Sequence, residues 1–188
     1  ALGSLMLASF HRLTPGRGGR PEVLFNLNLS GPPALFFVYH VHPLVDLFGP
    51  AAWVDSGAAY AGLEEDGGYQ RFANTVSVGF EGGGIGQWVW AGGIEVETAE
   101  ESQRIVMSDG TLMRDSGPWR LSTREGEADL DTDGDETLTL EEQFLADIRD
   151  GDEGWRRDAQ TAIDAARIGV AAELSVRESR RISLSGGG

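Results

Sequence analysis

Two short strands separated by a run of glycines give the strongest folding signal in this chain. Residues 76–80 alternate apolar side chains with small or polar ones, which is the period of a strand buried on one face. Residues 81–84 read Glu-Gly-Gly-Gly and supply the left-handed positions of a tight turn. Residues 85–91 predict the returning strand, with Trp88 and Trp90 on the same face. The centre of the chain therefore predicts an antiparallel sheet.

More strands extend this sheet in both directions. Asp109-Gly110 predicts a second hairpin, between residues 104–107 and 111–114. Further strands are predicted at residues 3–13, 52–61 and 119–123, with a last edge strand at 182–184. The five or six strands predicted between residues 52 and 123 are joined by short turns, which implies a mostly antiparallel arrangement.

Helices are predicted on both sides of the strand region. One segment starts after Pro32-Pro33 and ends before Gly49-Pro50, which are favourable start and stop signals. Two helices close the chain. An apolar stripe on the second one, predicted to lie close on the sheet, recurs at helical spacing: Ala159, Ile163, Ala166, Val170 and Leu174. The predicted fold is a single α+β domain over residues 1–188, an open-faced sheet with helices packed on one face.

Composition excludes several classes of function. Thirty acidic residues against fifteen arginines give a net charge of -15, which disfavours nucleic-acid binding. There is no lysine, so this chain alone cannot supply a lysine acid, base or Schiff base. There is no cysteine, which excludes disulfides and thiolate metal sites and suits a cytoplasmic location. No apolar run is long enough to cross a membrane.

Two motifs suggest ligand sites on first inspection. Residues 82–86 are rich in glycine, but a dinucleotide fingerprint needs a helix after the glycines, and here a strand follows. Residues 131–142 place acids at positions one, three, five and twelve of a calcium loop, with Glu136 where glycine is normally required. The alternative interpretation is an acidic loop in which Thr139 and Glu142 form a capping box for the next helix.

The histidine segment carries the remaining candidates for chemistry. His42 titrates near neutrality, so it is a candidate for proton transfer if a cleft surrounds it. Asp46 lies one turn further on the same helix face, where it could orient the ring. Tyr39, one turn before His42, and His40 are candidates for substrate binding. Three histidines in the whole chain do not make a convincing zinc site.

Several segments together resemble the C-terminal domain of the Gfo/Idh/MocA oxidoreductases. The resemblance begins with His42 and the residues that follow it up to Gly49-Pro50. It continues through the hairpin at residues 78–86 and ends with residues 144–151 and the alanine-rich helix that follows.

This resemblance implies a domain that binds a sugar or polyol-like substrate beside a nicotinamide ring, with His42 assisting proton transfer. NAD or NADP would be held by a Rossmann nucleotide-binding domain that is absent from this chain, so the chain alone would bind no cofactor and would not turn over. It also implies homo-oligomers formed through the free face of the sheet, with Trp88 or Trp90 at the interface.

Three departures leave a second function open. Val38 stands where the family commonly has an aspartate, the family's catalytic lysine has no counterpart, and the nucleotide-binding domain is missing. The alternative is a non-catalytic binding or assembly module that has kept the fold without the redox domain. A calcium-responsive module built on residues 131–142 is a third hypothesis.

Overall fold

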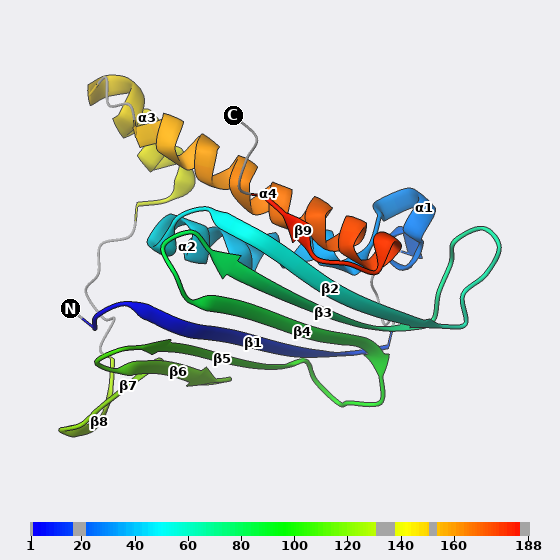
Figure 1. Cartoon of the computed structure of the whole chain (residues 1–188), viewed down its shortest axis with the longest axis horizontal. Coiled ribbons are helices and arrows are strands. Elements are labelled where there is room, and N and C mark those ends of the chain that lie inside the picture. The colour runs from blue at the N-terminus through cyan, green and yellow to red at the C-terminus, as the bar shows by residue number, and fades with distance from the viewer. Residues whose placement is uncertain (1, 17–21, 131–137, 151–153, 185–188) are drawn as a thin grey trace.

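A single large sheet, covered by helices on one face, organises the molecule (Figure 1). The computed structural model describes residues 2–16, 22–130, 138–150 and 154–184. In these residues the strands are β1 (Leu5–Pro15), β2 (Ala51–Ala61), β3 (Arg71–Phe80), β4 (Ile85–Ile94), β5 (Glu100–Met107), β6 (Thr111–Asp115), β7 (Arg120–Thr123), β8 (Gly126–Asp129) and β9 (Ile182–Ser183). The helical elements are η1 (Glu22–Phe25), α1 (Leu27–Ser30), η2 (Pro33–Phe37), α2 (Val38–Phe48), α3 (Leu140–Asp150) and α4 (Gly154–Glu178).

The strand order is β8-β7-β6-β5-β1-β4-β3-β2-β9. Eight of these nine strands in the described residues coincide with predicted segments, and β8 was not predicted. Every neighbouring pair is antiparallel except β1 and β4, which run parallel. β1 is thus inserted between the β3–β4 hairpin and the β5–β6 hairpin. The predicted class, a mostly antiparallel open-faced sheet with helices on one face, is confirmed.

The central hairpin forms where it was predicted. The amide of Phe80 donates to the carbonyl of Gly84 at 3.2 Å, and the amide of Gly83 donates back to Phe80 at 3.0 Å. Gly83 and Gly84 have φ angles of 93° and 83°, in the region that favours glycine. The glycine run at residues 82–86 is therefore a turn between strands, as expected.

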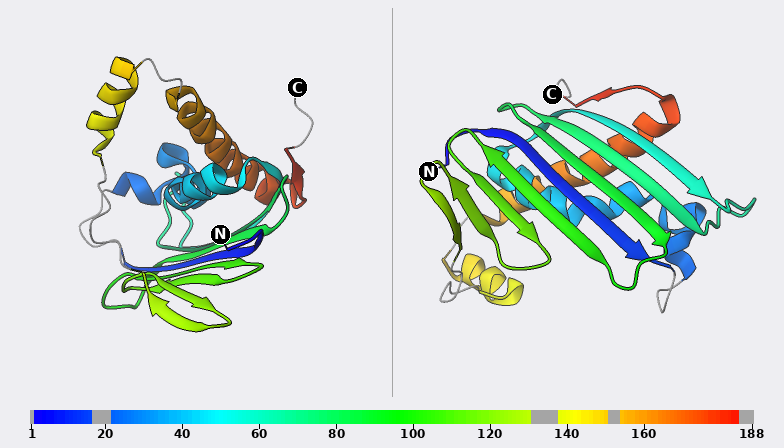
Figure 2. Two further views of the ribbon diagram at one scale, coloured as in Figure 1. Left: turned by 90° about the vertical axis from the view of Figure 1, so that its left-hand side faces the viewer. Right: turned by 90° about the horizontal axis from the view of Figure 1, so that it is seen from below.

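Helices α2 and α4 cover one face of the sheet, and no helix of the described residues covers the other, which we call the bare face (Figure 2). Pro33 begins η2, which leads directly into α2, and α2 ends at Gly49 with a φ of 83°. Val41 and Leu44 of α2, Ile168 and Ala172 of α4, and Trp88 of β4 are almost completely buried together. This packing makes one core between sheet and helices.

Two sequence predictions about buried faces are wrong. Trp88 is completely buried beneath the helices and Trp90 packs against that core, so neither lies on the bare face. On α4, Ile163 and Val170 are 50% and 62% exposed, whereas the buried positions include Ala165, Ile168, Gly169, Ala172 and Ser175. A 25-residue helix carries small residues on several faces, and the face with the smallest ones approaches the sheet.

The capping box of α3 is confirmed. The amide of Thr139 donates to Glu142 Oε2 at 2.9 Å, and the amide of Glu142 donates to Thr139 Oγ1 at 3.2 Å. The hydrogen bond from the Thr139 backbone lowers the pKa of Glu142. Residues 131–137 lie outside the described residues, so the calcium interpretation of this loop stays a prediction.

Ser175 joins α4 to the sheet. Its side chain is 1% exposed; its Oγ accepts the amide of Ser56 in β2 at 2.9 Å and donates to the carbonyl of Arg180 at 2.8 Å.

We expect Ser175→Ala to lower the free energy of unfolding by about 1–3 kcal/mol, because it leaves the amide of Ser56 without its acceptor in a dry interface. Urea denaturation of the chain measures this, with Ser77→Ala on the bare face as the control. A loss below about 0.5 kcal/mol, the size of an ordinary surface substitution, would contradict the role of this contact.

Candidate functional site

An aromatic hollow of about 320 Å³ opens between the covered face of the sheet and the segment that leads into α2. It is floored by β1 and β4 and walled by η1, η2 and α2. Its lining residues are Arg12, Leu24, Phe25, Pro33, Phe36, Phe37, Tyr39, His40, Tyr69, Phe72 and Trp90. A concave apolar surface with a few convergent polar groups is typical of a small-molecule site. We call it the aromatic hollow.

Trp90 is held in one orientation at the floor of this hollow. Its Nε1 donates to Thr14 Oγ1 at 3.0 Å, and Thr14 is 1% exposed. The rings of Phe72 and Phe37 lie 4.9 Å and 5.7 Å from it, both steeply inclined to it. Steeply inclined rings at these distances are a favourable aromatic geometry. The floor is therefore a rigid, flat surface suited to the apolar face of a ring or polyol.

His40 of α2 is the histidine that lines the hollow. Its ring lies 5.3 Å from that of Phe10 in β1, over the sheet. Burial lowers the pKa of His40 from 6.5, Glu101 raises it by a smaller amount, and Arg12 lowers it. The imidazole is therefore neutral at pH 7, the state in which it can accept a proton.

Arg12 connects the aromatic hollow to a second, polar one of about 410 Å³. This polar hollow is lined by Arg12, Ala99, Glu101, Gln103, Arg114 and Ser116. Arg12 forms a salt bridge with Glu101 across the β1–β5 pair, and its guanidinium lies 5.9 Å from the centre of the Trp90 ring. Its Nε is buried and has no acceptor among the described residues.

The structure separates the four residues that were predicted for the site. Tyr39 and His40 line the aromatic hollow, whereas His42 and Asp46 are not among its lining residues. His40 and His42 are two positions apart, about 200° around the helix, so they lie on opposite faces of α2. Asp46 is 3.8 Å from Arg157 of α4. Asp46 thus links the two helices.

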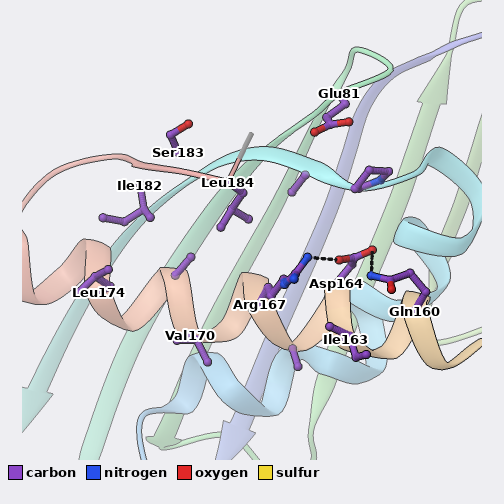
Figure 3. Close-up of a pocket in the computed structure, with 14 residues that line it drawn as sticks. Glu81, Gln160, Ile163, Asp164, Arg167, Val170, Leu174, Ile182, Ser183 and Leu184 are labelled. Carbon is purple, nitrogen blue, oxygen red and sulfur yellow. Dashed lines mark hydrogen bonds and ion pairs between the residues drawn. The ribbon is translucent and has the colours of Figure 1, made fainter. Parts of the chain in front are cut away.

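A larger hollow of about 1000 Å³ lies between α4 and the edge strand β9 (Figure 3). Within it, Asp164 accepts hydrogen bonds from Arg167 at 2.9 Å and from Gln160 at 3.0 Å. No histidine lines it. Size alone therefore does not make it the better candidate for chemistry.

The two ligand-binding patterns considered for the described residues, a metal cluster and a glycine-rich helix entry, have these outcomes. They contain no group of three histidine, cysteine or carboxylate residues positioned to hold a metal ion. The glycine-rich residues 82–86 lead into β4, not into a helix whose N-terminus could bind a pyrophosphate. Among the described residues, no helix is long and apolar enough to cross a membrane.

Sequence reasoning missed Arg12, Trp90 and Arg114 as site residues. The strand register that assembles them joins residues about eighty to one hundred positions apart. One feature of the sequence could have identified Arg12 as a site residue. It lies on the same side of β1 as the apolar residues Ala8 and Phe10. A charge on the buried face of a strand is a reason to look for a site.

Comparison with solved structures gives the fold. Biliverdin reductase from Synechocystis sp. PCC 6803, in complex with biliverdin and NADP+, matches 94% of this chain with a TM-score of 0.77 and 13% identity. Levoglucosan dehydrogenase, in complex with NADH and levoglucosan, matches 98% with a TM-score of 0.75 and 12% identity. An oxidoreductase from Agrobacterium radiobacter, in complex with NAD+, L-tartaric acid and magnesium, matches 97% with a TM-score of 0.70 and 12% identity.

The fold is therefore that of one part of these oxidoreductase structures. The resemblance to the C-terminal domain of the Gfo/Idh/MocA proteins is therefore confirmed at the level of the fold. The chain spans 56%, 60% and 58% of these three structures, so it corresponds to little more than half of each. No protein-family model matches the sequence, and no curated protein matches it.

The lowered pKa of His40 predicts how stability depends on pH. The unfolded chain binds a proton near pH 6.5, whereas folded His40 resists it, so stability falls as pH drops below 6.5 towards the folded pKa. We expect wild type to lose more thermal stability than His40→Gln between pH 7 and pH 5. If the difference in melting temperature between wild type and His40→Gln is the same at pH 7 and at pH 5, the environment described for His40 is contradicted.

Proposed function

We propose that this chain is the substrate-binding domain of a nicotinamide-dependent oxidoreductase that acts on a sugar or polyol-like substrate. The observation that supports it most strongly is the aromatic hollow with a neutral imidazole at its wall, on a fold otherwise seen in NAD(P)-linked oxidoreductases. Flat aromatic surfaces suit the carbon-bound face of a sugar, and a neutral imidazole suits removal of a hydroxyl proton.

The residues of this chain account for some steps of the proposed reaction, and the cofactor and a further domain account for the others. The nicotinamide cofactor supplies the hydride acceptor, and we propose that a Rossmann domain outside this chain holds it, since the described residues lack a dinucleotide turn. Trp90 and its aromatic neighbours position the substrate and exclude water. His40 takes the proton from the substrate hydroxyl. On this proposal the chain does not turn over alone.

His40 therefore takes the role that the sequence assigned to His42. The orientation of α2 supports the change, because His40 lines the hollow and His42 lies on the opposite helix face. The assignment to His42, with Asp46 orienting it, stays a prediction. So do the cytoplasmic location and the absence of nucleic-acid partners, which depend on composition.

The matched pair His40→Asn and His42→Asn tests this in the whole native protein, assayed on a panel of sugars and polyols with NAD and NADP. We expect His40→Asn to lower kcat about 100-fold, the usual contribution of a general base, and His42→Asn to lower it much less. The reverse pattern would restore the role of His42. Failure of the native protein to oxidise any member of the panel would favour the alternative, a binding or assembly module.

We also propose that the bare face of the sheet joins copies of this chain. Ile85, Leu7 and Val106 are register partners on β4, β1 and β5, and Ile85 and Leu7 are 44% and 39% exposed. Alternation along the strands places them on the face away from the helices, where they form an apolar strip.

A charge in this strip tests the oligomer. We expect Leu7→Glu to convert a dimer or larger assembly into a folded monomer, because the new carboxylate would be buried unpaired in the interface. Light scattering after size-exclusion chromatography measures the mass, and Leu47→Glu on exposed α2 is the control. A wild-type chain that is already monomeric, or a Leu7→Glu variant of unchanged mass, would contradict an interface here.

A further inference from the structure

A polar hollow lies beside the aromatic one, and Arg12 lines both. We propose that the substrate is a polyhydroxy carboxylate, such as a sugar acid, whose carbon chain lies on Trp90 and whose carboxylate binds Arg114 and Arg12. This inference rests on the proposed function, since it describes the same site.

The strand register places the residues of the two hollows next to each other on the same face of the sheet. Arg12 is the partner of Trp90 on one side and of Glu101 on the other. Gln103 is the partner of Phe10, which contacts His40, and on its other side it is the partner of Arg114. All these side chains therefore share the helix-covered face. Arg12 and Arg114 are two strands apart and offset by two residues along the strands, so their backbones are roughly 12 Å apart. One ligand can touch the imidazole side and the arginine side together.

The guanidinium of Arg114 has hydrogen-bond donors that are available to a ligand. Its Nε donates to the carbonyl of Gly117 at 2.9 Å, and no carboxylate pairs with its guanidinium among the described residues. The neighbouring acid Asp115 points away along the strand alternation and lies 3.7 Å from Arg120 instead. Arg114 is exposed to solvent at the rim of the polar hollow, so an incoming anion can reach its guanidinium. The planar guanidinium fits a carboxylate with two hydrogen bonds.

Arg12 adds a second donor. Glu101 occupies its terminal nitrogen, but its buried Nε has no acceptor among the described residues. Because that Nε is closed to solvent, the ligand would contact the outer part of the Arg12 side chain, which is 34% exposed, together with the Gln103 amide that lines the same hollow.

The charges in the polar hollow indicate how many negative charges the ligand carries. Arg12 and Arg114 are positive and Glu101 is negative, so the lining carries one net positive charge. A carboxylate cancels it. A phosphate monoester, with about two negative charges at pH 7, would leave the second one beside Glu101.

Isothermal titration calorimetry of the 188-residue chain tests the assignment with matched acids and alcohols: D-gluconate with D-glucitol, D-galactonate with galactitol, and D-gluconate 6-phosphate as the phosphate arm. We expect at least one acid to bind about tenfold more tightly than its alcohol, the effect of one good charge-assisted contact. Arg114→Gln should abolish that preference. Arg104→Gln is the control, because Arg104 lies on β5 but on the opposite face of the sheet.

Three results would overturn the carboxylate site: acids that bind no better than their alcohols or do not bind, a preference that survives Arg114→Gln, or tighter binding of the phosphate arm through its phosphate. The experiments can contradict the proposed function and the carboxylate site independently of each other. If the native protein oxidises neutral polyols in a His40-dependent way without regard to Arg114, the oxidoreductase assignment stands and the acid preference falls. If acids bind through Arg114 but no substrate is oxidised, the carboxylate site stands and the oxidoreductase assignment falls.

Discussion

The parallel pairing of β1 with β4 is the constraint on which the rest of the structure depends. It inserts the first strand of the chain into the middle of an otherwise antiparallel sheet, between two hairpins that are continuous in sequence. The pairing brings Phe10, Arg12 and Thr14 beside Trp88 and Trp90. Thr14 then fixes the Trp90 indole, Phe10 supports His40, and Arg12 joins the two hollows. Without this one pairing the floor of the candidate site would not exist.

Local signals in the sequence predicted much of the fold. The glycine turn at residues 81–84, the start and stop of the histidine helix, and the reciprocal bonds of Thr139 with Glu142 all depend on residues close together in the chain. Backbone sterics and short-range hydrogen bonds decide such features, so a single sequence carries them. The fold class followed from the number and spacing of strands.

The site was harder to predict because its parts meet only through long-range pairing. Nothing local reveals that Arg12 faces Glu101 and Arg114, or that α2 turns His40 rather than His42 towards the sheet. The hydrophobic period also misassigned α4, where small residues such as Ala165, Gly169 and Ala172 lie inside while the larger Ile163 and Val170 face outward. Close helix–sheet approach selected residue size, which a hydropathy pattern does not report.

The five tryptophans report directly on where substrate binds, because they are spread over the molecule. Trp90 lies on the floor of the aromatic hollow, Trp88 is buried in the main core, and Trp119, just before β7, packs against that core. Trp53 lies under Arg181 at the far edge, and Trp155 is exposed at the start of α4. The most direct test is to follow the indole N–H resonances of the chain while sugars, polyols and sugar acids are added. The account predicts that a bound ligand shifts the Trp90 resonance most strongly and leaves Trp53 and Trp155 in place. A ligand that shifts Trp53 or Trp155 while Trp90 stays unmoved would place the site elsewhere and contradict it.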